Sequence, residues 1–175
     1  MHINFEFKAK LEDISAAENI LMQHSPLFIG EDHQVDTYFN VPNGRLKLRE
    51  GTIEHALIFY ERTDSAAAKQ SNVTLFRHTP DVSLKQALTQ SLGVKVVIDK
   101  KRRIYFIDTV KFHFDKVEGL GTFIEVEAID KDGDIGLERL KEQCLFYQVL
   151  LNIKEEQFVA GSYSDLLLAK KSSII

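Results

Sequence analysis

Hydrophobic and polar residues alternate over much of the chain. This two-residue period predicts β-strands, because successive side chains of a strand point to opposite faces. The stretch INFEFKAK, residues 3–10, alternates without a break. The same pattern predicts a long strand, or two shorter ones, over residues 26–41. It also predicts strands over residues 45–50, 55–62, 72–78, 94–106, 109–116 and 121–129.

Four segments carry apolar residues at helical spacing and interrupt the strands. They are residues 13–24, 81–92, 136–151 and 162–170. Asp13 or Ser15 is suited to cap the first of these helices, and Asp81 or Ser83 the second, because short polar side chains accept hydrogen bonds from the free N–H groups of a first turn.

Most of the predicted strands follow one another at hairpin spacing, which favours an antiparallel sheet, open or closed into a barrel. The stretch TDSAAAKQSN, residues 63–72, is interpreted as a hairpin loop. Repeats and low-complexity linkers are absent from the sequence. We therefore expect a single domain of the α+β class over residues 1–175.

One predicted strand has an unusual polar face. Asn43 and Gly44 have the composition of a turn, and after them Arg45, Lys47 and Arg49 occupy every second position. These three cations share a face in a chain whose net charge is −4. Their face must be directed either at water or at something anionic.

Composition narrows the class of protein. The chain has 44% hydrophobic and 27% charged residues, which are globular values. Its negative net charge disfavours a nucleic-acid binder. The single cysteine, Cys144, excludes an internal disulfide and is expected to be buried. No apolar run approaches the roughly 20 residues of a membrane helix, so we expect a cytoplasmic protein without a membrane partner.

The charged strand faces allow two interpretations. In an open sheet they meet water and form cross-strand ion pairs. In a closed barrel the same residues line the interior, where carboxylates and guanidinium groups cannot be buried without partners. Such an interior would hold water, ions or an anionic ligand. Clustered carboxylates bind Mg²⁺ or Mn²⁺, and clustered Arg and Lys bind phosphate oxygens.

Several motifs resemble those of a known family. The first strand is similar to the E-x-E-x-K signature of the CYTH superfamily, the triphosphate tunnel metalloenzymes. The similarity continues in order through QVDTYFNVPNGRLKLRE, YERTD, KKRRIYF and VKFHFDKVEGLGTFIEVE, over about residues 3–130. The Y-x-R-x-D and K-x-S stretch makes the chain most similar to the class IV adenylyl cyclase branch.

The resemblance implies an eight-stranded antiparallel β-barrel, the triphosphate tunnel, with helices packed outside. It also implies a metal-dependent enzyme that acts on a triphosphate-bearing small molecule, in this branch ATP, converted to cyclic AMP and pyrophosphate. Two alternatives stay open. One is a triphosphatase acting on tripolyphosphate, thiamine triphosphate or a nucleoside triphosphate, and the other is a non-catalytic binder of triphosphate or polyphosphate.

The motifs also imply site residues. The metal, Mg²⁺ or Mn²⁺, is expected on Glu6, Asp115, Glu125 and Glu127, of which Glu6, Asp115 and Glu127 are also the expected catalytic residues. The phosphates are expected on Lys8, Lys47, Arg49, Arg62, Arg77, Lys100 and Arg102. The family register favours Lys100 and Arg102 over the neighbouring Lys101 and Arg103.

One position departs from the family pattern. Asn4 stands where the signature has its first glutamate. An amide oxygen can coordinate a metal but carries no charge, so we expect weaker metal binding or a different number of metal ions. This departure motivates the non-catalytic alternative. The base specificity and the choice of metal are not readable from the sequence, and a homodimer is an open option.

Overall fold

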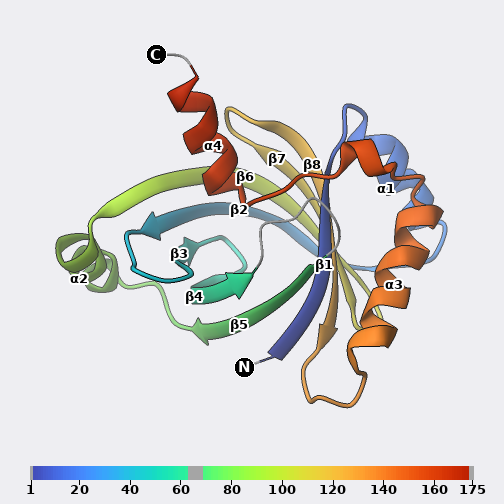
Figure 1. Cartoon of the computed structure of the whole chain (residues 1–175), viewed down its shortest axis with the longest axis horizontal. Helices are drawn as coiled ribbons and strands as arrows, with labels where there is room; N and C mark the ends of the chain where they lie inside the picture. The colour runs from blue at the N-terminus through green and yellow to red at the C-terminus, as the bar shows by residue number, and fades with distance from the viewer. Residues whose placement is uncertain (1, 63–68, 174–175) are drawn as a thin grey trace.

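The structure, a computed structural model, describes residues 2–62 and 69–173 (Figure 1). In these residues the strands are β1 His2–Lys10, β2 Leu27–Phe39, β3 Arg45–Glu50, β4 His55–Arg62, β5 Lys69–Arg77, β6 Val94–Ile107, β7 Val110–Val117 and β8 Gly121–Asp130. They form a closed antiparallel barrel in the order β1-β5-β4-β3-β2-β6-β7-β8. The predicted α+β class and eight-stranded barrel are confirmed.

Strand β1 closes the barrel, because it pairs with β5 along one edge and with β8 along the other. In the second pairing Glu6 lies opposite Glu127, and Lys8 lies opposite Glu125. Alternate residues of each strand of a barrel face its interior. The polar faces of β1 and β8 therefore point inward, towards those of the other strands.

The helices lie outside the ring of strands (Figure 1). They are α1 Ile14–Met22, α2 Val82–Leu92, α3 Leu137–Leu150 and α4 Tyr163–Ser172, with a short 3₁₀ turn at Glu155–Gln157. Helix α1 contacts β8, α3 contacts β1 and β8, α2 contacts β2, and α4 contacts β6. Asp13 caps α1 and Asp81 caps α2 through hydrogen bonds to backbone N–H groups.

The main hydrophobic core lies between the outer faces of β1, β7 and β8 and the helices α1 and α3. Phe112 of β7 is fully buried there. Its ring packs edge-to-face against that of Tyr147 of α3, with 4.7 Å between the ring centroids. Cys144 of α3 belongs to the same core. The apolar faces of these strands thus explain why α1 and α3 pack on this side of the barrel.

One boundary differs clearly from the sequence expectations. Strand β5 begins at Lys69, within the predicted loop 63–72, and residues 63–68 lie outside the described part. Residues 27–39 form the single long strand that was one of the two predicted alternatives, and its register against β6 shifts between Phe28 and Gly30 and between Tyr38 and Phe39. Within the described ranges, none of the helices combines the length and the apolar character needed to cross a membrane.

We predict that Phe112→Ala lowers the free energy of unfolding by about 3 to 5 kcal/mol, because it leaves a cavity in this core. Urea denaturation measures the loss. Phe76→Ala is the matched control, since Phe76 is 62% exposed and should lose less than about 1 kcal/mol. Equal losses in the two variants would contradict the position of the core.

Candidate active site

The barrel encloses a cavity of 640 Å³ lined by charged side chains. Of the described residues, the basic ones in its wall are Lys8, Lys47, Arg49, Arg77, Lys100, Arg102, Lys111 and Lys131. The acidic ones are Glu6, Glu54, Glu125 and Glu127. The described wall thus has four more basic than acidic residues, in a chain with a net charge of −4. Such a wall attracts anions.

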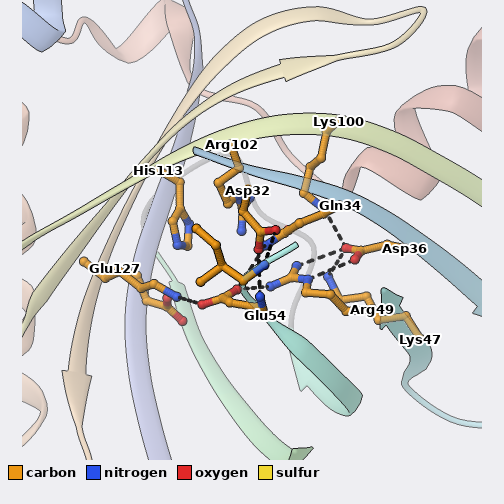
Figure 2. Close-up of polar contacts among 12 residues, drawn as sticks. Asp32, Gln34, Asp36, Lys47, Arg49, Glu54, Lys100, Arg102, His113 and Glu127 are labelled. Carbon is orange, nitrogen blue, oxygen red and sulfur yellow. Dashed lines mark hydrogen bonds and ion pairs between the residues drawn. The ribbon is translucent and has the colours of Figure 1, made fainter. Parts of the chain in front are cut away.

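One buried carboxylate, that of Asp36 on β2, organises the basic side chains of one wall (Figure 2). Arg49 binds both of its oxygens, through Nε at 2.9 Å and Nη2 at 3.0 Å. Lys47 and Lys100 bind its Oδ2 at 2.9 Å and 2.7 Å. One negative charge therefore holds three positive ones, and the cluster keeps a positive excess that can attract an anion.

Asp36 stays ionised in this cluster. Burial would raise the pKa of Asp36, but the charges of Arg49, Lys100 and Lys47 hold that pKa well below its ordinary value. Asp36 lies directly opposite Arg49 in the β2–β3 pairing. The sequence analysis missed Asp36, although it belongs to the DTYF motif. The signal for it was a lone acid facing a strand with three cations.

Lys100 and Arg102 point into the barrel, as the family register favoured. Both are at most 3% exposed, whereas Lys101 is exposed and Arg103 reaches outward to Glu18 at 2.6 Å. Burial lowers the pKa of Lys100 to about 7, against the opposing effect of Asp36. Lys100 thus changes charge near neutral pH.

A second buried cluster surrounds Arg102 of β6. Its guanidinium group binds Asp115 through Nε at 2.7 Å and Nη2 at 2.5 Å, and Nη2 also binds Glu125 at 2.6 Å. The hydroxyl of Tyr163, on α4, donates a hydrogen bond to Asp115 at 2.7 Å. Asp115 is fully buried and does not line the cavity. The structure places it behind Arg102, where it orients the guanidinium group.

Glu125 is engaged by cations on both of its oxygens. Lys8 binds Oε1 at 2.9 Å, while Arg102 and, at 3.2 Å, His113 Nδ1 contact Oε2. Burial opposes ionisation, but Lys8 and Arg102 hold the pKa of Glu125 well below its ordinary value. Burial and the charges of Arg102 and Lys111 lower the pKa of His113 to about 3, so this histidine is neutral at pH 7.

The remaining predicted acids, Glu6 and Glu127, face each other across the β1–β8 pairing. Burial and the charge of Glu6 raise the pKa of Glu127 to about 7. Asn4 donates a hydrogen bond from Nδ2 to Oε1 of Glu127. The other end of the amide, Asn4 Oδ1, is buried and has no hydrogen-bond partner within the described residues.

These oxygens fit a hard divalent cation. A carboxylate whose ionisation is disfavoured by burial and by a neighbouring acid, and a buried amide oxygen without a donor, are groups that Mg²⁺ or Mn²⁺ would stabilise. The fit is incomplete, because no three His, Cys, Asp or Glu side chains in the described part form a metal-binding group. Glu6, Glu127 and Asn4 could therefore supply part of a coordination shell, with substrate oxygens and water as the other ligands.

Glu54 is a further acidic side chain in the cavity wall that the sequence analysis missed. It precedes β4, in the connection from β3, and it binds Arg49 at 2.9 Å and Lys111 at 2.5 Å. These two cations hold its pKa below the ordinary value, against the effect of burial. A glutamate in a short loop has no sequence signal of its own, so only the fold reveals its position.

Two predicted phosphate contacts, Arg62 and Arg77, and a further cation, Arg45, lie at the ends of strands. Arg77, at the end of β5, lines the cavity and is exposed. Arg45, at the start of β3, pairs with Asp165 of α4 at 2.9 Å. Arg62 ends β4, and its side chain lies outside the described part.

Fold and cavity together define a closed antiparallel tunnel with a basic wall and a pair of facing carboxylates. The CYTH domain family matches residues 2–163, and the chain belongs to this family. The members of this superfamily are typically adenylate cyclases or triphosphatases. They act on triphosphate substrates and are in general metal-dependent.

Individual relatives agree with this placement. Adenylate cyclase CyaB of Aeromonas hydrophila is 27% identical over 174 residues, which cover 92% of this chain and 86% of the relative. The PH1012 protein of Pyrococcus horikoshii OT3 has a similar structure, with a TM-score of 0.79, 23% identity, and coverage of 95% and 99% of the two chains. The Hippeastrum protein HpAC1, whose structure is described as revealing a dominant triphosphatase activity, has a TM-score of 0.64 and 15% identity over 97% of this chain and 96% of its own.

We predict that Asp36→Asn lowers the free energy of unfolding by about 3 to 5 kcal/mol at pH 7, because the buried Arg49 and Lys100 and the partly buried Lys47 lose their counter-charge. The pKa of Asp36 is depressed in the folded state, so its stabilising effect is present above the unfolded-state pKa and is lost as the pH falls through the folded-state value. Denaturation at pH 7 measures the loss. The control Glu142→Gln breaks a pair that is about two-thirds exposed and should cost less than about 1 kcal/mol.

A second prediction concerns Lys100, whose pKa of about 7 makes anion binding pH-dependent. A bound anion favours the charged amine, so binding takes up a proton and affinity falls as the pH rises above 7. The affinity for tripolyphosphate should fall about tenfold between pH 7 and 8.5 relative to Lys100→Arg, which stays charged. Calorimetric titration at several pH values measures both proteins, and parallel profiles would contradict the prediction.

Proposed function

We propose that this protein is a metal-dependent enzyme that acts on a triphosphate substrate in the manner of class IV adenylyl cyclases, converting ATP to cyclic AMP and pyrophosphate. The observation that carries the proposal is the surplus of basic residues in the wall of a cavity inside the closed barrel, together with the two facing carboxylates of Glu6 and Glu127 in that wall. A polyphosphate chain would neutralise the basic side chains of the wall, and a divalent cation would neutralise the carboxylates. The relationship to the Aeromonas cyclase supports the same choice.

The basic residues bind and orient the phosphates in this proposal. The carboxylate of Asp36 accepts hydrogen bonds from Lys47, Arg49 and Lys100. The carboxylate of Asp115 holds the guanidinium group of Arg102 in the same way. Their side chains are therefore held in place before the substrate arrives. Such preorganisation lowers the barrier because little reorientation is needed during the reaction. Lys8, Arg62 and Arg77 are proposed as further phosphate contacts.

The metal would be held by Glu6 and Glu127, with the Asn4 amide oxygen beside them. When bound, it would neutralise charge on the phosphate oxygens. Asp115 and Glu125 were also expected as metal ligands, and Asp115 as a catalytic residue. Because cations engage both in the structure, we propose that they position Arg102 and Lys8 instead.

The cyclase reaction and triphosphate hydrolysis differ in the attacking group. In the cyclase the ribose 3′-oxygen attacks the α-phosphorus, loses its proton, and pyrophosphate leaves. In a triphosphatase, water attacks the γ-phosphorus and the diphosphate leaves. The fold that this chain shares with the Hippeastrum protein HpAC1, described as having a dominant triphosphatase activity, supports hydrolysis as the second candidate. Asn4, which reduces the charge available to a metal, supports a non-catalytic binder as the third.

We predict that purified protein with Mg²⁺ or Mn²⁺ converts ATP to cyclic AMP and pyrophosphate. Chromatographic separation of the products from ATP, GTP, thiamine triphosphate and tripolyphosphate tests this directly. Orthophosphate in place of cyclic nucleotide would move the protein to the triphosphatases. Saturable binding of a triphosphate without turnover would make it a binder.

Glu127→Gln should reduce the metal-dependent rate by at least about a hundredfold, because it removes one of the two facing carboxylates. Glu50→Gln is the control of equal charge, since Glu50 pairs with Lys85 of α2, away from the cavity. Equal rates in the two variants would exclude a role for Glu127.

A further inference from the structure

The carboxylate of Glu54 sits in a pocket of donors within the cavity wall (Figure 2). Oε2 accepts hydrogen bonds from Arg49 Nη1 at 2.9 Å and from Gln34 Nε2 at 3.1 Å. Oε1 accepts one from Lys111 Nζ at 2.5 Å. These donors come from three strands, β3, β2 and β7. A guanidinium group, an amide and an ammonium group converging on one point are the donors that a phosphate group takes.

The backbone behind Glu54 is fixed. Both oxygens of the buried Asp32 accept hydrogen bonds from the connection between β3 and β4, namely from the N–H groups of Thr52 at 2.6 Å, Ile53 at 2.8 Å and Glu54 at 3.0 Å. A side chain on Gly51 would collide with Asp32, because an added Cβ would lie 2.6 Å from its Oδ1. Glu54 could therefore leave its pocket by rotating its side chain while the loop stays in place.

The donors themselves are also fixed without Glu54. Arg49 is held by Asp36, and the Nε2 group of Gln34 is held by Asp32 at 2.7 Å. The glutamate is 28% exposed, so it can be reached from the cavity, whereas Arg49 is only 9% exposed. If Glu54 turned away, two of its three donors would remain aimed at the same point.

We propose that Glu54 occupies a phosphate subsite made by Arg49, Lys111 and Gln34, so that its carboxylate competes with an incoming phosphate group. This inference deepens the proposed function, on which it rests for the kind of anion. The glutamate keeps Arg49 and Lys111 neutralised while the cavity is empty, and it leaves the subsite when phosphate enters. Only an anion that binds Arg49 and Lys111 more strongly than the Glu54 carboxylate does would therefore occupy the subsite, which excludes weakly charged anions.

The test is metal-free binding of inorganic tripolyphosphate, measured by isothermal titration calorimetry in EDTA at pH 7. Glu54→Gln keeps the size of the side chain and the N–H bond to Asp32, but removes the competing charge. We expect it to bind tripolyphosphate at least about tenfold more tightly than the wild type. Glu54→Ala, which empties the subsite, should bind at least as tightly as Glu54→Gln.

Glu50→Gln controls for the general loss of one negative charge, because it lies four positions away and pairs outside the cavity with Lys85. Thermal midpoints of all the variants show whether each is folded. Tighter binding by the Glu54 variants alone supports the proposal. Unchanged or weaker binding by folded Glu54→Gln, an equal gain in Glu50→Gln, or no binding by any protein overturns it.

Turnover is not needed for this measurement, so the two proposals can fail separately. Tighter binding by Glu54→Gln together with no product from any triphosphate would leave the subsite in place and remove the enzymatic function. Product formation with unchanged tripolyphosphate binding by Glu54→Gln would support the enzymatic function and exclude the Glu54 subsite.

Discussion

Pairing of β1 with both β5 and β8 is the constraint on which the rest of the structure depends. An open sheet could leave its polar face in water, where charged groups need no partners. Closure turns that face into the wall of a cavity and brings charged side chains of several strands within reach of one another. The same closure turns the apolar faces outward, so helices such as α1 and α3 must cover them. Charged interior and helical exterior are two consequences of one pairing.

A closed interior imposes an electrostatic condition, because a buried charge without a partner is costly. The chain meets this condition because single carboxylates form ion pairs with two or three basic side chains at once. Asp36 holds Lys47, Arg49 and Lys100, and Glu125 holds Lys8 and Arg102. Sharing of this kind makes the cations tolerable in the empty cavity but does not neutralise them. The excess of positive charge that remains in the cavity wall would attract an anionic substrate.

Much of the fold could be predicted from the sequence. Strict alternation in residues 3–10 and 45–50 identified strands, because burial on one side selects for a two-residue period. The resemblance then supplied the closure, which no local pattern can show. For the N-terminal cap of the first helix the sequence left two candidates, Asp13 and Ser15. In the structure Asp13 is the cap, because its side chain accepts hydrogen bonds from backbone N–H groups of the first turn.

The candidate site was only partly predictable. Lys47 and Arg49 stood out because cations recur on one strand face, whereas the family resemblance favoured Lys100 and Arg102 over their neighbours. Asp36 and Glu54 did not, because the importance of each depends on which cations another strand brings to it. A sequence shows which face of a strand a residue occupies, but ion pairs across a barrel depend on register between strands that are distant in the chain.

Asn4 shows how these constraints act on the side of the cavity where Glu6 and Glu127 face each other. A glutamate there would add a third carboxylate beside Glu6 and Glu127, where burial and the charge of Glu6 already raise the pKa of Glu127 to about 7. The amide instead donates a hydrogen bond to Glu127, so it adds a donor rather than a further negative charge beside that carboxylate. At the metal site proposed above, the amide would also contribute less charge to a bound cation than a glutamate would. Such a site would depend more strongly on oxygens that the substrate itself brings to the metal.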